Sequence, residues 1–449
     1  MSVVAGRTQE CRAMGHYAFL VPAYTGHLNP MLVLARALER RGHRISVLSP
    51  PIAESKVRQA GLRFIPFAER EFFPGEWSRL TGRAGELTGF AATRAATEVI
   101  ALLARAAQRE LSEIAARERF DGLVMDQICV GTEGVCAVLG LPLAVACSAL
   151  PMHIEWRVPP PLFPWPYRPA LPFRFANVIG QFAVNMTGLA VAREIVPYRF
   201  RHRLQPMGYH YINELRPALV QVAQQPAAFD FPRRSLPDNF HYTAPWIEEG
   251  EGGDRNFPWG RLDGRPLIYA SLGTLQNRLQ FAFQLIVDAC AGQDAQLVLA
   301  LGREGASLPG EVPPGTIVVD YAPQVTLLRR ATLVITHGGL NTVLESLRAG
   351  VPMIALPITN DQPGVAARLR HFGLGDFIPI REATAPALAG MIRHILRTPA
   401  YADRARQFAA GLQRLDGPAA AAELIEMAFT TRQRVRRNAV TSPPAMAVA

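Results

Sequence analysis

Short apolar runs alternate with stretches of helical periodicity along most of the chain. The first unit has apolar runs at Tyr17–Val21 and Arg44–Leu48, with a helical pattern over Leu28–Arg41 between them. This succession predicts a βαβ unit, and continuous apolar runs indicate parallel strands that are buried on both faces. The pattern continues with predicted strands at Arg63–Phe67, Gly122–Asp126 and Leu143–Cys147, and with predicted helices at about Glu86–Arg117 and Thr132–Leu139.

A second alternation of the same kind begins near residue 266. A stretch rich in Gly, Glu, Asp and Pro precedes it, and we interpret residues 246–265 as an interdomain linker. The predicted elements that follow are strands at Leu267–Leu272, Gln296–Leu301, Thr316–Tyr321, Leu333–Thr336 and Met353–Leu356, and helices at Asn277–Cys290, Val325–Arg330, Leu340–Ala349 and over 385–429.

The fold class that follows is α/β, with two doubly wound sheets. A chain of 449 residues is too long for one ordinary core and fits two domains of roughly 200 residues each. We predict a first domain over 14–245 and a second over 266–430, whose last helices pack back on the first. The tail over 431–449 is predicted to be disordered.

Two segments of the first half depart from this regularity. Prolines and aromatic residues crowd together between Pro151 and Pro172, which excludes regular helix and central strand and predicts a structured loop. The apolar stretch Val178–Ala192 is interrupted by Gln181 and Asn185, so it is too short and too polar to span a bilayer. Its amphipathic pattern instead suggests contact with a hydrophobic ligand or a membrane surface.

The charge balance limits the classes of binding partner that we expect. There are 47 Lys and Arg against 37 Asp and Glu, a formal net charge of +10, which suits anionic ligands or an anionic membrane surface. The arginines are scattered and form no stripe with interleaved aromatics, so nucleic acid is not an expected partner. The five cysteines lack metal-ligand spacing and are interpreted as reduced residues of a cytoplasmic protein, and no metal is expected.

The strongest candidate site follows the predicted strand Leu333–Thr336. In parallel sheets, ligands lie beyond the carboxyl ends of the strands. A Gly pair lets the backbone approach a ligand, and the helix that begins there offers free N–H groups to an anion such as a diphosphate. The alternative, a tight turn followed by a capped helix with a solvated glutamate, is less favoured because these donors occur together: His337, Gly338, Gly339, Asn341, Thr342 and, for a sugar diol, Glu345.

A candidate general base follows the first strand. His27 lies in the turn Gly26–Pro30, and an imidazole titrates near neutral pH, as a base for an alcohol must. Asp126 ends the strand Gly122–Asp126 on the same side of the sheet, where it is expected to hold the imidazole. A solvent-exposed or capping His27, and an Asp126 bonded only to backbone, are the structural alternatives.

Three weaker candidates remain. The turn at Gly273 and Thr274 follows the first strand of the second half and lies where it could touch phosphate, although a purely structural turn is equally compatible. His153 and Trp156 in the irregular segment are candidate acceptor contacts, with simple packing as the alternative.

The stretch from Tyr321 to Gln362 resembles the donor-binding signature of the family 1 nucleotide-sugar glycosyltransferases. Tyr321 stands where tryptophan is usual, and Leu340 replaces the tryptophan of a Trp-Asn pair. The Gly-His-x-x-Pro turn at 26–30 also matches the family. The matching residues are Ala-Pro-Gln at 322–324, Thr-His-Gly-Gly at 336–339, Asn-Thr at 341–342, Glu345, Gly-Val-Pro at 350–352 and Asp-Gln at 361–362.

This resemblance implies roles for single residues. Tyr321 would stack on the base and Gln324 contact it, Glu345 would take the ribose hydroxyls, and Asp361 and Gln362 would take the sugar hydroxyls. The diphosphate would be held by His337, Asn341 and Thr342. The full expected donor-binding set is Gly26, Gly273, Thr274, Tyr321, Ala322, Gln324, His337, Gly338, Gly339, Leu340, Asn341, Thr342, Glu345, Asp361 and Gln362.

The resemblance also implies a fold and an activity. Two facing Rossmann-like domains (GT-B type) would enclose a cleft, and a UDP-sugar would donate a hexose, preferably glucose, with inversion and without metal or other cofactor. His27 and Asp126 would be catalytic. The chain looks most like bacterial carotenoid (zeaxanthin-type) and macrolide glycosyltransferases, which implies a small lipophilic hydroxylated acceptor. We expect a cytoplasmic enzyme with peripheral contact to the inner face of the membrane. The alternatives are a nucleotide-sugar epimerase and a non-catalytic auxiliary protein of the same architecture.

Overall fold

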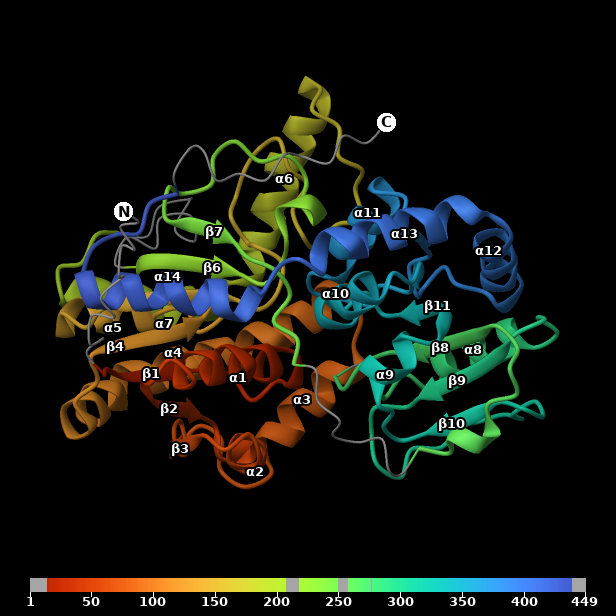
Figure 1. Cartoon of the computed structure of the whole chain (residues 1–449). Coiled ribbons are helices and arrows are strands. Elements are labelled where there is room, and N and C mark those ends of the chain that lie inside the picture. The colour runs from red at the N-terminus through yellow and green to blue at the C-terminus, as the bar shows by residue number, and fades with distance from the viewer. Residues whose placement is uncertain (1–13, 207–217, 249–256, 276, 438–449) are drawn as a thin grey trace, which may run out of the picture.

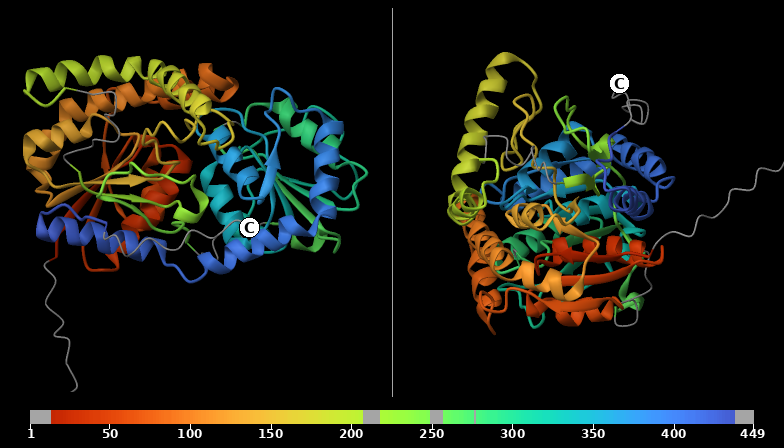
Figure 2. Two further views of the ribbon diagram at one scale, coloured as in Figure 1. Left: turned by 90° about the horizontal axis from the view of Figure 1, so that it is seen from above. Right: turned by 90° about the vertical axis from the view of Figure 1, so that its left-hand side faces the viewer.

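The computed structural model describes residues 14–206, 218–248, 257–275 and 277–437, and the statements below concern these residues. They form two parallel sheets, each covered by helices on both faces (Figure 1). The two sheets lie side by side, and the chain crosses between them twice (Figure 2). The predicted α/β class with two doubly wound domains is confirmed.

The first sheet is formed by seven described strands in the order β3-β2-β1-β4-β5-β6-β7. Because the strand order reverses between β1 and β4, the loops after these two strands open a crevice at the carboxyl edge of the sheet. The strands are β1 (His16–Leu20), β2 (Arg44–Ser49), β3 (Arg63–Pro66), β4 (Gly122–Asp126), β5 (Leu143–Cys147), β6 (Ala218–Ala223) and β7 (Phe240–Tyr242).

Helices cover both faces of this sheet because each strand is apolar on both sides. One face packs against α1 (Thr25–Glu39) and α2 (Glu54–Gln59). The other face packs against α3 (Glu76–Glu86), α4 (Gly89–Glu118), α5 (Thr132–Leu139) and α7 (Leu189–Arg201). A further helix, α6 (Leu171–Thr187), lies outside these layers and contacts α4 and α7.

The second sheet has six described strands in the order β10-β9-β8-β11-β12-β13, so its crevice lies between β8 and β11. The strands are β8 (Leu267–Ser271), β9 (Gln296–Ala300), β10 (Ile317–Val319), β11 (Ala331–Thr336), β12 (Met353–Ala355) and β13 (Gly375–Phe377). The covering helices are α8 (Gln280–Cys290), α9 (Gln324–Leu328), α10 (Leu340–Ala349), α11 (Gln362–His371), α12 (Ala385–Arg397) and α13 (Pro399–Leu412).

The last helix, α14 (Gly417–Thr431), returns to the first domain. Its apolar residues join the core on the α1 face of the sheet, beside α1 and against β6, and Phe429 lies edge-on against Tyr17. The chain crosses close to Ala244, where a Cβ on Gly417 would collide with the Ala244 carbonyl. Val435 then pairs with Leu219 through its N–H. The predicted disorder therefore does not hold for residues 432–437, while residues 438–449 lie outside the described part of the chain.

Several boundaries differ from the sequence-based expectations. The long helix predicted at about Glu86–Arg117 is present as α4, which begins at Gly89, while Glu86 ends the separate helix α3. The helical patterns predicted over 385–429 form the three helices α12, α13 and α14. Strands β6, β7 and β13 were not predicted. Of the predicted linker over 246–265, the structure describes residues 246–248 and 257–265. The four described cysteines are buried and unpaired, as expected, and Cys11 lies outside the described residues.

A buried ion cluster joins the two domains. The Asp230 carboxylate, in the first domain, accepts hydrogen bonds from Arg368 of α11 at 2.6 Å, from Arg233 at 2.8 Å and from the Tyr242 hydroxyl at 2.6 Å. The Arg368 guanidinium also lies 4.3 Å from the centroid of the Phe231 ring. Burial works to raise the pKa of Asp230, but the two arginines outweigh it and hold that pKa well below its usual range.

Candidate active site between the two domains

The crevice of the first sheet brings together the predicted histidine and aspartate. Strands β1 and β4 are parallel neighbours, with Leu20 opposite Met125, so the residues that follow them meet at one edge. His27 lies in the first turn of α1 rather than in the loop before it, and its Nδ1 is 3.1 Å from both carboxylate oxygens of Asp126. The Asp126 side chain is fully buried, whereas His27 keeps 19% exposure. The predicted contact between His27 and Asp126 is present.

Ser148 is a third member of this cluster. It directly follows β5, and its hydroxyl donates to Asp126 Oδ2 at 2.5 Å while its oxygen lies 2.8 Å from His27 Nδ1. Because a carboxylate only accepts hydrogen bonds, the hydroxyl proton points to Asp126, and the Ser148 oxygen then accepts from Nδ1–H. This arrangement fixes the proton of neutral His27 on Nδ1 and leaves the lone pair on Nε2. The position after a predicted strand was a signal that could have identified Ser148.

The surroundings of His27 change its basicity. Burial lowers its pKa, but the Asp126 carboxylate beside Nδ1 and the nearby Asp361 raise it by more, so the pKa lies above the ordinary 6.5. A raised pKa makes the neutral imidazole a stronger base toward an acceptor hydroxyl. The site can therefore take a proton from an acceptor hydroxyl at Nε2.

The second crevice has the features of an anion site. Helix α10 begins at Leu340 with Gly339 as its N-cap, and no side chain caps its first N–H groups. The imidazole of His337 lies between this turn and the turn after β8, since a Cβ on either Gly339 or Gly273 would meet His337 ring atoms at 3.0 Å or less. Gly273 and Gly338 have φ of +74° and +86°. Glycines are therefore required here by close approach as well as by turn geometry.

The predicted phosphate donor His337 is uncharged at neutral pH. Burial lowers its pKa to about 4, against a hydrogen bond to the Ser271 backbone that works to raise it. The ring therefore offers an N–H as a neutral donor. The fixed positive end of α10, rather than an imidazolium, is the main positive field toward a bound diphosphate.

Asn341 connects the two crevices. Its side-chain N–H donates to the Gly26 carbonyl at 2.8 Å, and its oxygen accepts from Gln224 at 2.8 Å. The Gly26 carbonyl is available because its partner in the helix would be residue 30, and Pro30 has no N–H to donate. Gln224, which also donates to the Ser148 carbonyl, follows the unpredicted strand β6 and was missed for that reason.

The expected base and ribose residues form a second cluster beside α10. Gln324 donates to Glu345 at 2.5 Å and lies 3.3 Å from the Thr342 hydroxyl, while the Tyr269 hydroxyl donates to Gln324 at 3.0 Å. Tyr321 is 62% exposed just after β10, with Ala322 next to it, so its ring is open to stacking. Thr274 follows Gly273, and its carbonyl accepts from Asn277.

Binding of UDP is expected to weaken as the pH falls from 8 to 6. Burial raises the pKa of Glu345 to about 7, against the hydrogen bond from Gln324. A diol donates to the ionised carboxylate, and the ionised fraction falls from about nine tenths at pH 8 to about one tenth at pH 6. The Kd for UDP, measured by calorimetry, should therefore rise about fivefold to tenfold between these pH values.

The matched variant for this prediction is Glu345→Gln, which has no titrating group at this position. At pH 8 the variant should bind UDP with a higher Kd than the wild type does. Its Kd should also depend much less on pH, and the pH dependence that persists comes from the phosphates and other groups. Equal pH dependence in both proteins would show that Glu345 does not contact the nucleotide.

Asp361 and Gln362 lie at the start of α11, where Asp361 contacts the first domain. Asp361 accepts from the Leu150 N–H of the first domain at 3.0 Å, and burial raises its pKa. The Gln362 oxygen accepts from the N–H groups of Ile358 and Thr359 at 2.9 and 3.0 Å, which holds the loop before it. Their predicted contact with sugar hydroxyls stays a prediction.

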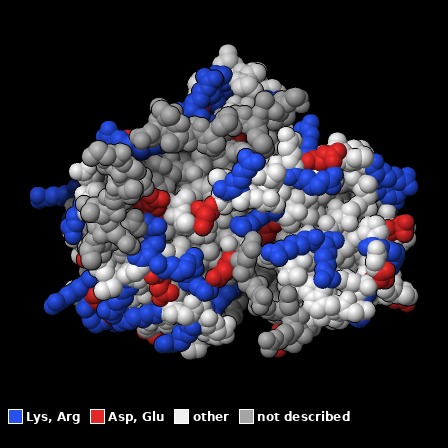
Figure 3. All heavy atoms as spheres, viewed as in Figure 1, with Lys and Arg blue, Asp and Glu red and all other residues white. Residues whose placement is uncertain are grey.

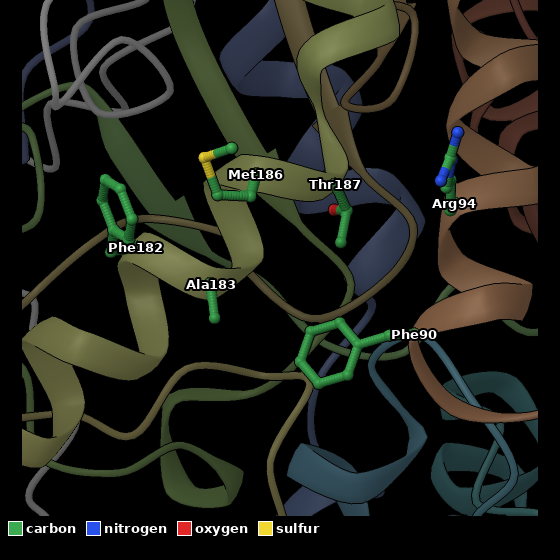
Figure 4. A pocket seen from close by; sticks show the side chains of 6 residues that line it. All are labelled: Phe90, Arg94, Phe182, Ala183, Met186 and Thr187. Atoms are coloured by element: carbon green, nitrogen blue, oxygen red, sulfur yellow. The ribbon is translucent and has the colours of Figure 1, made fainter.

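An apolar groove lies at the side of the first domain. It has a volume of about 500 Å³ between α4 and α6, and Figure 4 shows the lining side chains. The predicted acceptor residue His153 is not brought there: it is buried against Gln221 and Phe240, and burial lowers its pKa to about 3. Trp156 is half exposed. The groove is lined by Phe90, Arg94, Phe182, Ala183, Met186 and Thr187.

The described residues contain no group of three or more His, Cys, Asp or Glu side chains that could hold a metal ion.

Two facing Rossmann-like domains, with a His-Asp pair in one crevice and an open helix N-terminus in the other, define a GT-B glycosyltransferase. Residues 19–410 match the family described as UDP-glucoronosyl and UDP-glucosyl transferase. The chain belongs to this family, and it is an enzyme that uses a nucleotide-sugar donor and a glycosyl acceptor.

Individual relatives agree with this assignment. The chain is 31% identical to a zeaxanthin glucosyltransferase of Pantoea ananas, over 94% of this chain and 98% of that protein. It is 26% identical to a demethyllactenocin mycarosyltransferase of Streptomyces fradiae, over 93% and 87% of the two chains. Among solved structures, the glycotransferase of kitacinnamycin superposes with a TM-score of 0.73 at 23% identity, covering 93% of this chain and all of that one. The similarity to this solved structure supports the assignment of the fold.

Proposed function

We propose that this enzyme transfers a glucosyl group from UDP-glucose, with inversion, to a hydroxyl of a small lipophilic acceptor. The observation that carries the proposal is the His27 imidazole, whose Nδ1 is held by Asp126 and Ser148, opposite the start of α10. Its remaining nitrogen, Nε2, is the one available to an acceptor at the cleft.

The transfer is a single displacement. His27 Nε2 takes the acceptor proton as the acceptor oxygen attacks the anomeric carbon, and the bond from that carbon to the diphosphate oxygen breaks with its electron pair. Asp126 stabilises the imidazolium, and the N-terminus of α10 with the His337 N–H meets the charge that develops on the diphosphate. One displacement inverts the anomeric configuration. No step needs a metal ion.

The acceptor class rests on two observations. The groove beside the cleft is lined by Phe90, Phe182 and Met186, which favour an apolar ligand. Relatives at 31% identity are zeaxanthin glucosyltransferases, which favours a hydroxylated polyene or isoprenoid and glucose as the sugar. The buried, unpaired cysteines of the described chain are compatible with the cytoplasmic location that we propose.

The test is a screen of donors and acceptors with the purified enzyme. UDP-glucose, TDP-glucose and UDP-galactose are each offered with a hydroxylated carotenoid in detergent, a macrolide and a hydrophilic phenol, with and without EDTA, and products are read by mass spectrometry. We expect an EDTA-insensitive β-glucoside of the lipophilic acceptor, with its anomeric configuration read by proton NMR. Glycosylation of the phenol alone, or an α-glucoside, would contradict the proposal, and a new sugar isomer without acceptor would indicate an epimerase.

A further inference from the structure

Helix α6 exposes an apolar face. Phe175, Ile179 and Phe182 are 70%, 71% and 62% exposed, and their spacing places them on one side of the helix. Val178 and Met186 extend the same face. A surface helix of a globular protein normally turns its polar side to water, so this orientation is reversed. Figure 2 shows α6 projecting beyond the body of the first domain.

The opposite side of α6 is firmly supported, so its exposed face is fixed in place. Asn177, Gln181 and Val184 are buried there. The Pro- and aromatic-rich segment forms the platform, since a Cβ on Gly180 would meet the Trp165 ring at 2.8 Å, and Trp165 stacks on Phe163 at 4.2 Å. The irregular segment therefore serves to hold α6 outward.

The stretch of chain that carries this face has basic but no acidic residues. From Trp156 to Arg193 the sequence contains no Asp or Glu. The guanidiniums of Arg157 and Arg174 lie 5.7 and 4.9 Å from the Trp156 ring centroid. Figure 3 shows basic and no acidic side chains on the visible side of the projecting tip. The basic residues of the stretch are Arg157, Arg168, Arg174 and Arg193.

The apolar groove lies beside this face, and its α4 side adjoins a contact with the second domain. Phe182 and Met186 of α6 line the groove together with Phe90 of α4. Beside Phe90, the Gly89 N–H donates to the Ile358 carbonyl, and the Gly89 carbonyl accepts from the Thr359 hydroxyl at 3.1 Å. Residues 358 and 359 precede Asp361 in the donor site. The groove thus shares residues with the apolar face, and Phe90 on its α4 side is next to the residue that contacts this loop of the second domain.

We propose that α6 docks the enzyme on a membrane surface containing anionic lipids, so that an acceptor dissolved in the bilayer reaches the cleft through the groove. The claim that the acceptor reaches the cleft through the groove rests on the proposed function. The helix lies in the interface with its apolar face among the lipid chains and its arginines at the phosphates. Among the described residues, no single helix is long and apolar enough to cross a membrane, and α6 and α7, which reach that length together, are bent by 74°.

The test measures binding of the full chain to vesicles without sugar or acceptor. Vesicles of phosphatidylcholine alone are compared with vesicles that also contain phosphatidylglycerol, by co-sedimentation at low and high salt. We expect binding that needs the anionic lipid and weakens with salt. Phe175→Glu and Ile179→Glu should each lower the partition coefficient at least about tenfold, because an apolar contact is lost and a carboxylate faces the lipid. Arg174→Gln should lower it about fivefold.

The matched control is Phe281→Glu on α8, because Phe281 is 53% exposed on a helix of the second domain. It should bind vesicles like the wild type. All variants should keep wild-type activity on an acceptor dissolved in detergent, which separates docking from catalysis. The same loss in Phe281→Glu, no binding by the wild type, or wild-type binding by Phe175→Glu and Ile179→Glu would overturn the proposal.

A second copy of the chain is the competing occupant of this face. Sedimentation equilibrium of the wild type and of Ile179→Glu distinguishes it from a membrane. We expect both to be monomers in the absence of lipid. A wild-type dimer that Ile179→Glu dissociates would assign the face to self-association and overturn membrane docking. These results do not depend on which acceptor is glycosylated, so failure of the acceptor proposal is recognised separately in the product screen.

Discussion

His27→Ala is expected to lower kcat about a thousandfold, within the range that removal of a general base produces. The variant loses the imidazole whose Nε2 is placed to take the acceptor proton, while Asp126 and Ser148 stay buried behind it. The KM for the nucleotide sugar should change little, because all of the expected donor residues except Gly26 lie on the other domain. Steady-state kinetics with saturating donor and acceptor measures both values.

The pH dependence of the same reaction distinguishes a base from a merely structural histidine. Wild-type kcat/KM should rise with pH through the pKa of His27, which its surroundings place above 6.5, because the protonated ring cannot accept a proton. In His27→Ala this acidic limb should disappear from the residual activity. An unchanged kcat, or an unchanged limb, would contradict the role of His27 as base.

Asp230→Asn is expected to lower the free energy of unfolding by about 3–5 kcal/mol, as for other buried pairs that lose one partner. The substitution keeps the shape but leaves Arg233 and Arg368, with exposures of only 3% and 1%, as two like charges without a carboxylate. Because Arg368 belongs to α11 and Asp230 to the first domain, the contact between the domains should weaken too. Chemical denaturation followed by fluorescence and circular dichroism measures the change.

Asp238→Asn is the control for this prediction. Asp238 is 47% exposed and lies 3.3 Å from Arg436, so its replacement should change the stability by less than about 1 kcal/mol. Because the folded pKa of Asp230 is depressed, its stabilising contribution is present above the unfolded pKa and is lost only as the pH falls through the lower folded value. Equal effects of the two substitutions would show that the buried cluster does not link the domains.

The sequence alone determined the architecture and placed several candidate site residues at the ends of strands. Apolar runs alternating with helical periods depend only on local spacing, so they predicted the parallel sheets, and the strand ends placed His27 near Asp126. The Gly pair before α10 is equally local, because turn and helix start adjoin in the chain. Short strands with a polar residue inside, such as β6 with Gln221, lack this signal and were missed.

The tertiary structure decided which side chains meet across long stretches of chain. Ser148 joins His27 over 121 residues, Asn341 reaches Gly26 over 315, and Arg368 pairs with Asp230 over 138. The contact of Ser148 with His27 depends on the order of the strands in the first sheet, and the other two contacts depend on how the two domains pack. Neither strand order nor domain packing can be read from local spacing. The same reason applies to α6: its periodicity shows two different faces, but only the neighbouring elements determine that the polar face is covered and the apolar face is exposed.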